Sequence, residues 1–201
     1  MKALRCTGIL VTAIVIVGCP GLAQAELLGV DPGTAKGDGV YGRFDGDVDL
    51  GVGLGARLAA PGLGPNLRVT GHFLSTVGVS VDVTWPVSSD IGWSLGTAID
   101  LRPLFLPRWA LDLQQGPAFV DLLVDSVSLS AGPVFHPLFH QLDDSEVGFG
   151  MEAGFSIPLS ARSQGFWLDL RGSGRWIGDA PPWGGLVSLS WYTSLLSPVV
   201  R

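Results

Sequence analysis

The chain has 201 residues, a formal net charge of −6 at pH 7, and charged side chains at 15% of its positions. A water-soluble domain usually carries about a quarter charged residues. The acidic balance and the lack of a basic stripe argue against a nucleic-acid partner. Beyond residue 25 no stretch approaches ~20 continuous apolar residues, so no transmembrane helix is predicted.

Residues 1–25 have the pattern of a secretory signal peptide. Lys2 and Arg5 give a positively charged start, and an apolar stretch of 12 residues follows over 7–18. Ala23-Gln24-Ala25 is an A-x-A cleavage site. We therefore expect export and a mature protein that begins at Glu26.

Both cysteines, Cys6 and Cys19, lie within this leader. A lipoprotein signal, in which Cys19 becomes the acylated first residue, is the alternative, and Pro20 directly after the cysteine argues against it. Cleavage before Glu26 leaves 176 residues, one domain by length, with a net charge of −8. Such a chain has no disulfide and no cysteine-bound metal.

Residues 26–39 are rich in Gly, Pro and Asp and form the expected N-terminal segment. From Val40 to Ala60 every even position is Gly, Val, Leu, Phe or Ala, while Tyr41, Asp and Arg occupy odd positions. A period of two predicts a β-strand with one apolar and one polar face. The same period runs over 67–85, which fits either one tilted strand or two strands with a turn near Ser75-Thr76.

Residues 91–101 alternate again, and 102–109 end that strand. The period is lost over 109–127, which predicts a short helix or two, with Gly116-Pro117 starting the second. Strand is expected to resume over 127–135, followed by a loop over 136–145. Three clearer strands follow, at 147–159, 166–176 and 187–195.

Seven strands are clear, or eight if one long stretch divides. Long alternation repeated this often is typical of a transmembrane β-barrel, which usually has an even number of strands. We therefore predict an all-β, antiparallel, up-and-down barrel of about eight strands over residues 40–201, with a helical excursion near 110–125. A barrel of eight strands has an interior that side chains fill, which disfavours a porin.

The composition of the polar face indicates which face lines the interior. A soluble, lipocalin-like periplasmic carrier of an apolar ligand would put its polar face in water and carry many Lys and Glu there. This face is mostly Gly, Ser and Thr with charges of both signs, which suits a narrow lumen where charges pair. The predicted lumen charge network is Arg43, Asp45, Asp47, Asp49, Arg57, Arg68, Asp82, Asp100, Arg102, Glu152, Asp169, Arg171 and Arg175.

The leader, the lack of cysteine after it and the alternating strands from 40–60 through 185–196 resemble the small outer-membrane β-barrel proteins of Gram-negative bacteria, with an OmpA/OmpX-like architecture. The resemblance implies an outer-membrane location, and lipids and the barrel-insertion machinery as partners. Many such proteins end in an aromatic residue that this machinery reads. This chain ends Val199-Val200-Arg201, and Tyr192 would need a trailing extension to serve that purpose.

Residues that could support chemistry are few. His136 and His140 have a metal-ligand spacing, but Pro137 between them breaks a helix. Three alternating carboxylates, at 45, 47 and 49, invite a calcium interpretation, but on a strand they do not converge. His72 would need a serine within hydrogen-bond reach to act in a lipid-modifying hydrolase or acyltransferase. We therefore expect no metal, no cofactor and no catalytic site, and a structural or interaction role whose loop partners are undefined.

Overall fold

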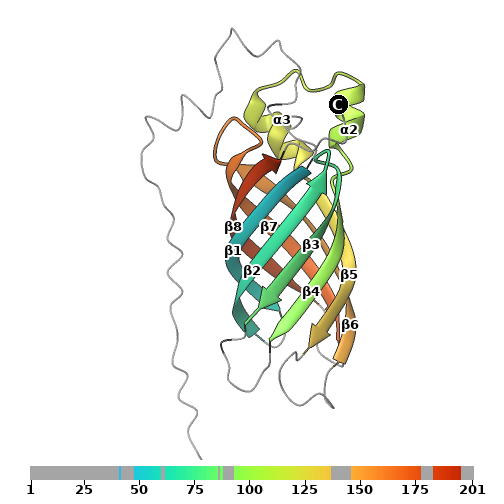
Figure 1. Ribbon diagram of the computed structural model, residues 1–201, viewed down its shortest axis with the longest axis vertical. Helices are drawn as coiled ribbons and strands as arrows, with labels where there is room; N and C mark the ends of the chain where they lie inside the picture. The colour runs from blue at the N-terminus through green and yellow to red at the C-terminus, as the bar shows by residue number, and fades with distance from the viewer. Residues whose placement is uncertain are drawn as a thin grey trace, which may run out of the picture.

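The computed structural model describes residues 41, 48–59, 62–85, 87, 93–136, 146–177 and 183–195. Eight antiparallel strands within these ranges pair in sequence order, and β1 also pairs with β8, so the sheet closes into a barrel (Figure 1). The predicted up-and-down barrel is therefore confirmed. The strands are β1 (Val48–Ala59), β2 (Gly62–Phe73), β3 (Val77–Thr84), β4 (Ser94–Leu101), β5 (Ser128–His136), β6 (Glu146–Pro158), β7 (Gly165–Trp176) and β8 (Trp183–Leu195).

The apolar face of the strands points outward and the polar face points into the lumen. On β1, Leu54 is 65% exposed, whereas Arg57 on the opposite face is 1% exposed. The same contrast holds on β4, where Ile99 is 60% exposed and Asp100 is fully buried. This is the reverse of a soluble lipocalin-like barrel.

The long alternating stretch over 67–85 is two strands, β2 and β3, joined by residues 74–76. Leu74 and Ser75 have φ angles of 48° and 53°, and the Thr76 N–H donates to the Phe73 carbonyl at 3.1 Å. Left-handed residues at the two central positions are typical of tight hairpin turns. Phe73 and Val77 pair directly, so both must point to the same face and the alternation continues through the turn.

Two helices, α2 (Phe105–Ala110) and α3 (Ala118–Asp125), connect β4 to β5. Figure 1 shows both beyond the barrel end where β4 ends and β5 begins, which we call the helical end. The helix over 118–125 begins directly after Gly116-Pro117, as predicted. The predicted first helix begins too late in the chain. Proline usually interrupts a helix, but α2 includes Pro107. Pro107 lies in the first turn of α2, where its missing N–H has no intrahelical partner to lose.

The predicted first strand is also too long at its start. Tyr41 lies in a turn with a φ angle of 51°, not in β1. Its backbone carbonyl accepts a hydrogen bond from the Ser163 N–H at 2.9 Å, in the connection between β6 and β7. Tyr41 therefore lies at the helical end and is not part of the barrel wall.

Aromatic side chains gather near both ends of the barrel. At the end opposite the helices, Trp85 and Trp93 have ring centroids 5.0 Å apart, and Trp176 and Trp183 are 6.2 Å apart. Towards the helical end, Phe166 and Trp191 are edge to face at 4.7 Å. Two aromatic girdles flanking an apolar band are typical of barrels in membranes.

None of the helices in the described ranges is long and apolar enough to cross a bilayer.

Candidate functional site: a charged lumen closed at one end

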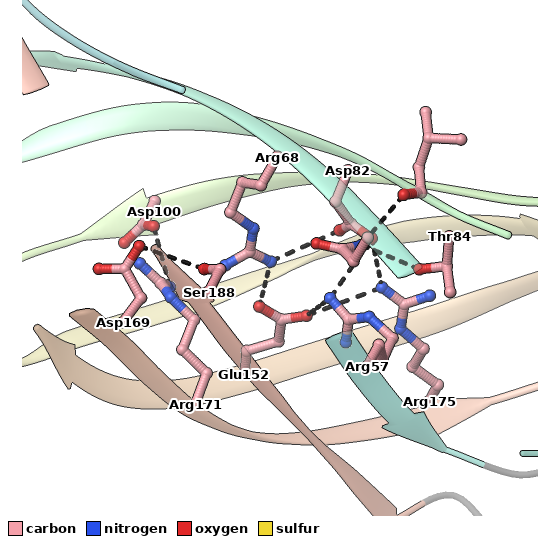
Figure 2. Close-up of polar contacts among 12 residues, drawn as sticks. Arg57, Arg68, Asp82, Thr84, Asp100, Glu152, Asp169, Arg171, Arg175 and Ser188 are labelled. Carbon is pink, nitrogen blue, oxygen red and sulfur yellow. Dashed lines mark hydrogen bonds and ion pairs between the residues drawn. The ribbon is translucent and has the colours of Figure 1, made fainter. Parts of the chain in front are cut away.

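The centre of the lumen holds an ion-pair cluster whose side chains come from five strands. Its members are three arginines and two carboxylates, which Figure 2 shows converging from opposite walls: Arg57, Arg68, Asp82, Glu152 and Arg175. Alternation brings each of them inward, because each occupies the polar face of its strand.

Each carboxylate in this central cluster contacts all three arginines. Asp82 lies 3.3 Å from Arg57 Nη2, 3.5 Å from Arg68 Nη2 and 2.8 Å from Arg175 Nη2. Glu152 lies 2.8 Å from Arg57 and 3.7 Å from Arg175, and it also accepts a hydrogen bond from Arg68. Shared contacts of this kind offset the large cost of taking the charges out of water.

A second group lies nearer the helical end, around Asp100. Arg171 Nη1 donates to Asp100 Oδ2 at 3.2 Å, and His72 Nε2 lies 3.8 Å from Asp100 Oδ1. The guanidinium of Arg102 lies 5.3 Å from the centroid of the Tyr192 ring, which favours a cation–π contact.

Two further carboxylates are held by hydroxyl groups instead of arginines. Asp169 accepts hydrogen bonds from Ser156 and Ser190, and from Ser188 at 3.4 Å. Asp49 accepts hydrogen bonds from Ser75 and, at 2.6 Å, from Ser194. In the described part of the lumen the predicted network therefore contributes five arginines and five carboxylates, whose charges balance: Arg57, Arg68, Arg102, Arg171, Arg175, Asp49, Asp82, Asp100, Glu152 and Asp169.

Three members of the predicted network, Arg43, Asp45 and Asp47, lie outside the described residues. The calcium interpretation of the 45–49 segment is therefore not tested, and Asp49 itself is bound to serines. His140 also lies outside the described residues, as does the predicted loop between His136 and Glu146. Within the described ranges, no group of three His, Cys, Asp or Glu side chains could hold a metal ion.

The lumen has little free space around these groups. One cavity near Tyr192 and Arg102 and another near Glu152 and Arg175 each have about 10 Å³ accessible to the centre of a water molecule. That is about the space that one water molecule needs. Each of these two cavities is therefore too small for an organic ligand.

The helices close the lumen at the helical end. Leu122 of α3 is fully buried against Trp167 and Tyr192, which point inward from β7 and β8. Phe105 at the start of α2 is also fully buried. Sequence reasoning missed this plug, because a buried leucine on a short helix gives no sign of which surface it covers.

Polar contacts hold the plug together. Arg108 of α2 lies 2.6 Å from Asp121 and 2.6 Å from Asp125 of α3, and Gln114 donates to Asp125. The Tyr41 hydroxyl donates to Asp121 Oδ2 at 2.9 Å. Burial, together with this hydrogen bond, raises the pKa of Tyr41 to about 12. The phenol therefore stays protonated and remains a donor at any physiological pH.

The geometry gives His72 no nucleophile to activate. Among the described residues neither ring nitrogen has a hydrogen-bond partner, and Asp100 Oδ1 lies 3.8 Å from Nε2. Ser75, a neighbour of His72 in the sequence, donates instead to Asp49. Asp82, which lies on the polar face of β3, is held among the arginines of the central cluster.

No protein-family model matches the chain, and no curated protein matches it. The chain is similar to the crystal structure of the N-terminal β-barrel domain of Pseudomonas aeruginosa OprF. The two are 12% identical with a TM-score of 0.45, and the match covers 73% of this chain and 96% of that domain. The strand pairing and closure of this chain by themselves define the eight-stranded barrel.

Proposed function

We propose that the protein is a small integral barrel of the bacterial outer membrane with a structural or interaction role and no catalytic activity. The observation that carries this proposal is the distribution of polarity across the wall. Leu54, Val79 and Ile99 point outward with 65%, 62% and 60% exposure, while four of the five arginines of the described lumen are buried. Such a surface suits lipid and not water.

The dimensions of the barrel agree with this location. The longest strands have 13 residues, and at ~3.3 Å per residue and a tilt of about 40° they rise about 30 Å along the barrel axis. The hydrocarbon core of a bilayer is also ~30 Å thick. The aromatic pairs near the two ends would then lie at the two interfaces.

A structural or interaction role is favoured over transport and catalysis. The balanced ion pairs and the Leu122 plug fill the described part of the lumen, which disfavours a pore. Among the described residues His72 has no serine partner, which disfavours a lipid-modifying hydrolase or acyltransferase. Interactions would then involve the lipid-facing wall and the segments that connect the strands outside the membrane.

Membrane fractionation tests the proposal directly. The full-length chain is expressed in a Gram-negative host, outer membrane and periplasm are separated, and unheated and boiled samples are compared by gel mobility. Recovery in the outer membrane with a heat-dependent shift is the expected result. Recovery from the periplasm without detergent, and without a shift, would overturn the proposal and restore the soluble carrier.

A further inference from the structure

The helical plug shares part of the inverted distribution of polarity of the barrel wall. The two carboxylates that contact Arg108 are inside, since Asp121 is 2% exposed and Asp125 is fully buried. Leu111 and Leu113 are outside, at 68% and 56% exposure, with an exposed aspartate between them. A plug surrounded by water would gain nothing from this arrangement, since exposed leucines are more stable when they are removed from water.

The exposed apolar residues of the plug continue the outward face of the wall. Leu101, the last residue of β4, pairs with Val77, and these two side chains are 45% and 43% exposed. Leu104 follows three residues later at 37% exposure, directly before α2. The apolar surface of the β3–β4 side therefore extends past the end of the strands and onto the segment 104–113.

Trp109 on α2 lies where an interfacial aromatic residue is expected. At the helical end, Phe166 and Trp191 supply aromatic rings on β7 and β8, whereas Val77 and Leu101 on the β3–β4 side are aliphatic. Trp109 is 44% exposed and follows Leu101 by eight residues. Tryptophan prefers the interface because its ring is apolar while its N–H remains near water.

We propose that residues 104–113 lie on the lipid bilayer at the helical end, with Trp109, Leu111 and Leu113 inserted at the boundary between headgroups and acyl chains. This inference rests on the proposed function, because it needs the barrel wall to be embedded in lipid. The segment acts as an interfacial anchor, and it holds α3 and Leu122 over the mouth of the lumen through the Arg108 ion pairs.

Site-specific labelling tests the anchor. In a full chain carrying Cys6→Ser and Cys19→Ser, a single cysteine is introduced by Leu111→Cys, Gln115→Cys or Val79→Cys and labelled with an environment-sensitive fluorophore. Each protein is folded into phosphatidylethanolamine and phosphatidylglycerol vesicles, and a heat-dependent gel shift verifies the fold. Quenching by lipids with a nitroxide near the headgroup, or deep in the acyl chain, is compared with quenching by aqueous iodide.

We expect the label at position 111 to be quenched several-fold more by the shallow lipid nitroxide than the label at position 115, which is exposed and polar in the same connection. The label at 79, on the barrel wall, is expected to respond to the deeper nitroxide. Iodide should quench position 115 and spare position 111.

The outcomes separate this inference from the proposed function. Lipid quenching at 79 combined with iodide quenching at 111 would overturn the anchor and leave the membrane barrel intact. A label at 111 that is shielded from both lipid and iodide, with cross-linked dimers, would replace the lipid by a second copy of the chain. Loss of lipid quenching at 79 would overturn both proposals.

Discussion

Arg57 Nη2 and Glu152 Oε1 lie 2.8 Å apart although β1 and β6 are not neighbours in the sheet. The ion pair therefore spans the lumen and joins opposite walls of the barrel. Arg68 on β2 also contacts Glu152, so this single carboxylate contacts arginines on two adjacent strands of the opposite wall.

Removing the charge of Glu152 is expected to destabilise the folded barrel. Glu152→Gln keeps the shape of the side chain but removes a negative charge that Arg57 and Arg68 contact. Removing one partner of a buried ion pair costs about 3–5 kcal/mol. Urea unfolding of the barrel in lipid vesicles measures the free energy of unfolding. Glu146→Gln, at an exposed position on the same strand, is the matched control and should change this free energy by less than about 0.5 kcal/mol. Equal midpoints for the two variants would contradict a structural cluster.

A charge on the outward face is expected to be costly only if that face meets lipid. Leu54 lies in the middle of β1, where it pairs with Leu67 and Leu189 and is 65% exposed. Leu54→Arg should lower the free energy of unfolding in vesicles by about 2–4 kcal/mol. Gln115→Arg, at an exposed position of the plug, should have little effect. A Leu54→Arg protein as stable as the wild type would indicate that the wall faces water.

A side chain at Gly51 is expected to disrupt packing of the lumen. A Cβ atom there would lie 2.5 Å from Tyr192 Cε1 and 2.6 Å from Thr70 Oγ1, so the buried Tyr192 ring and the Thr70 side chain have to shift. Gly51→Ala should cost about 1–3 kcal/mol by overpacking. At Gly172 the nearest atom would be 3.9 Å away, so Gly172→Ala serves as the control. The double variant Gly51→Ala/Tyr192→Ser should recover part of the loss, and no recovery would place the strain elsewhere.

The alkaline pH dependence of the plug should follow Tyr41. Its pKa is about 12 in the folded protein against an ordinary 10.0, so the folded state holds the proton more tightly than the unfolded state. The stabilisation is fully present below pH ~10 and is lost as the pH rises towards ~12. The difference in phenolate absorbance between wild type and Tyr41→Phe measures the titration. If the midpoint of this absorbance difference lay near pH 10, the hydrogen bond from Tyr41 to Asp121 would not form in solution.

His72→Gln should leave the lipid A mass profile of the producing cells unchanged, because no serine of the described ranges donates to His72. Wild type, His72→Gln and an empty vector are compared by mass spectrometry of extracted lipid A, with the heat-dependent shift as a control for folding. A modification that is present with wild type and lost with His72→Gln would replace the non-catalytic role by a lipid-modifying enzyme.

Local alternation was enough to predict the architecture and the side of the wall on which each residue lies. Arg57 and Leu54 are assigned to opposite faces because one is at an odd and the other at an even position of the same strand. This assignment does not require the partner strand to be known. The same reasoning left open whether residues 67–85 are one strand or two with a turn near Ser75-Thr76, and the structure shows two. Leu74 is not a typical turn residue, and the three-residue connection keeps Phe73 and Val77 on the same face, so the alternation continues through the turn.

The sequence by itself determined a barrel of about eight strands and a charged face opposite an apolar one, since these depend on residue type and spacing along the chain, and it predicts a secretory leader over residues that lie outside the described ranges. Only the tertiary structure decided which groups meet. Closure of the barrel brings Glu152 to Arg57 across the lumen, and it seats Leu122 on Trp167 and Tyr192. Tyr41 reaches Asp121, 80 residues away, because chain folding at the helical end brings two distant segments together. Such contacts depend on strand register and on the path of connections, neither of which is encoded in a local period of two.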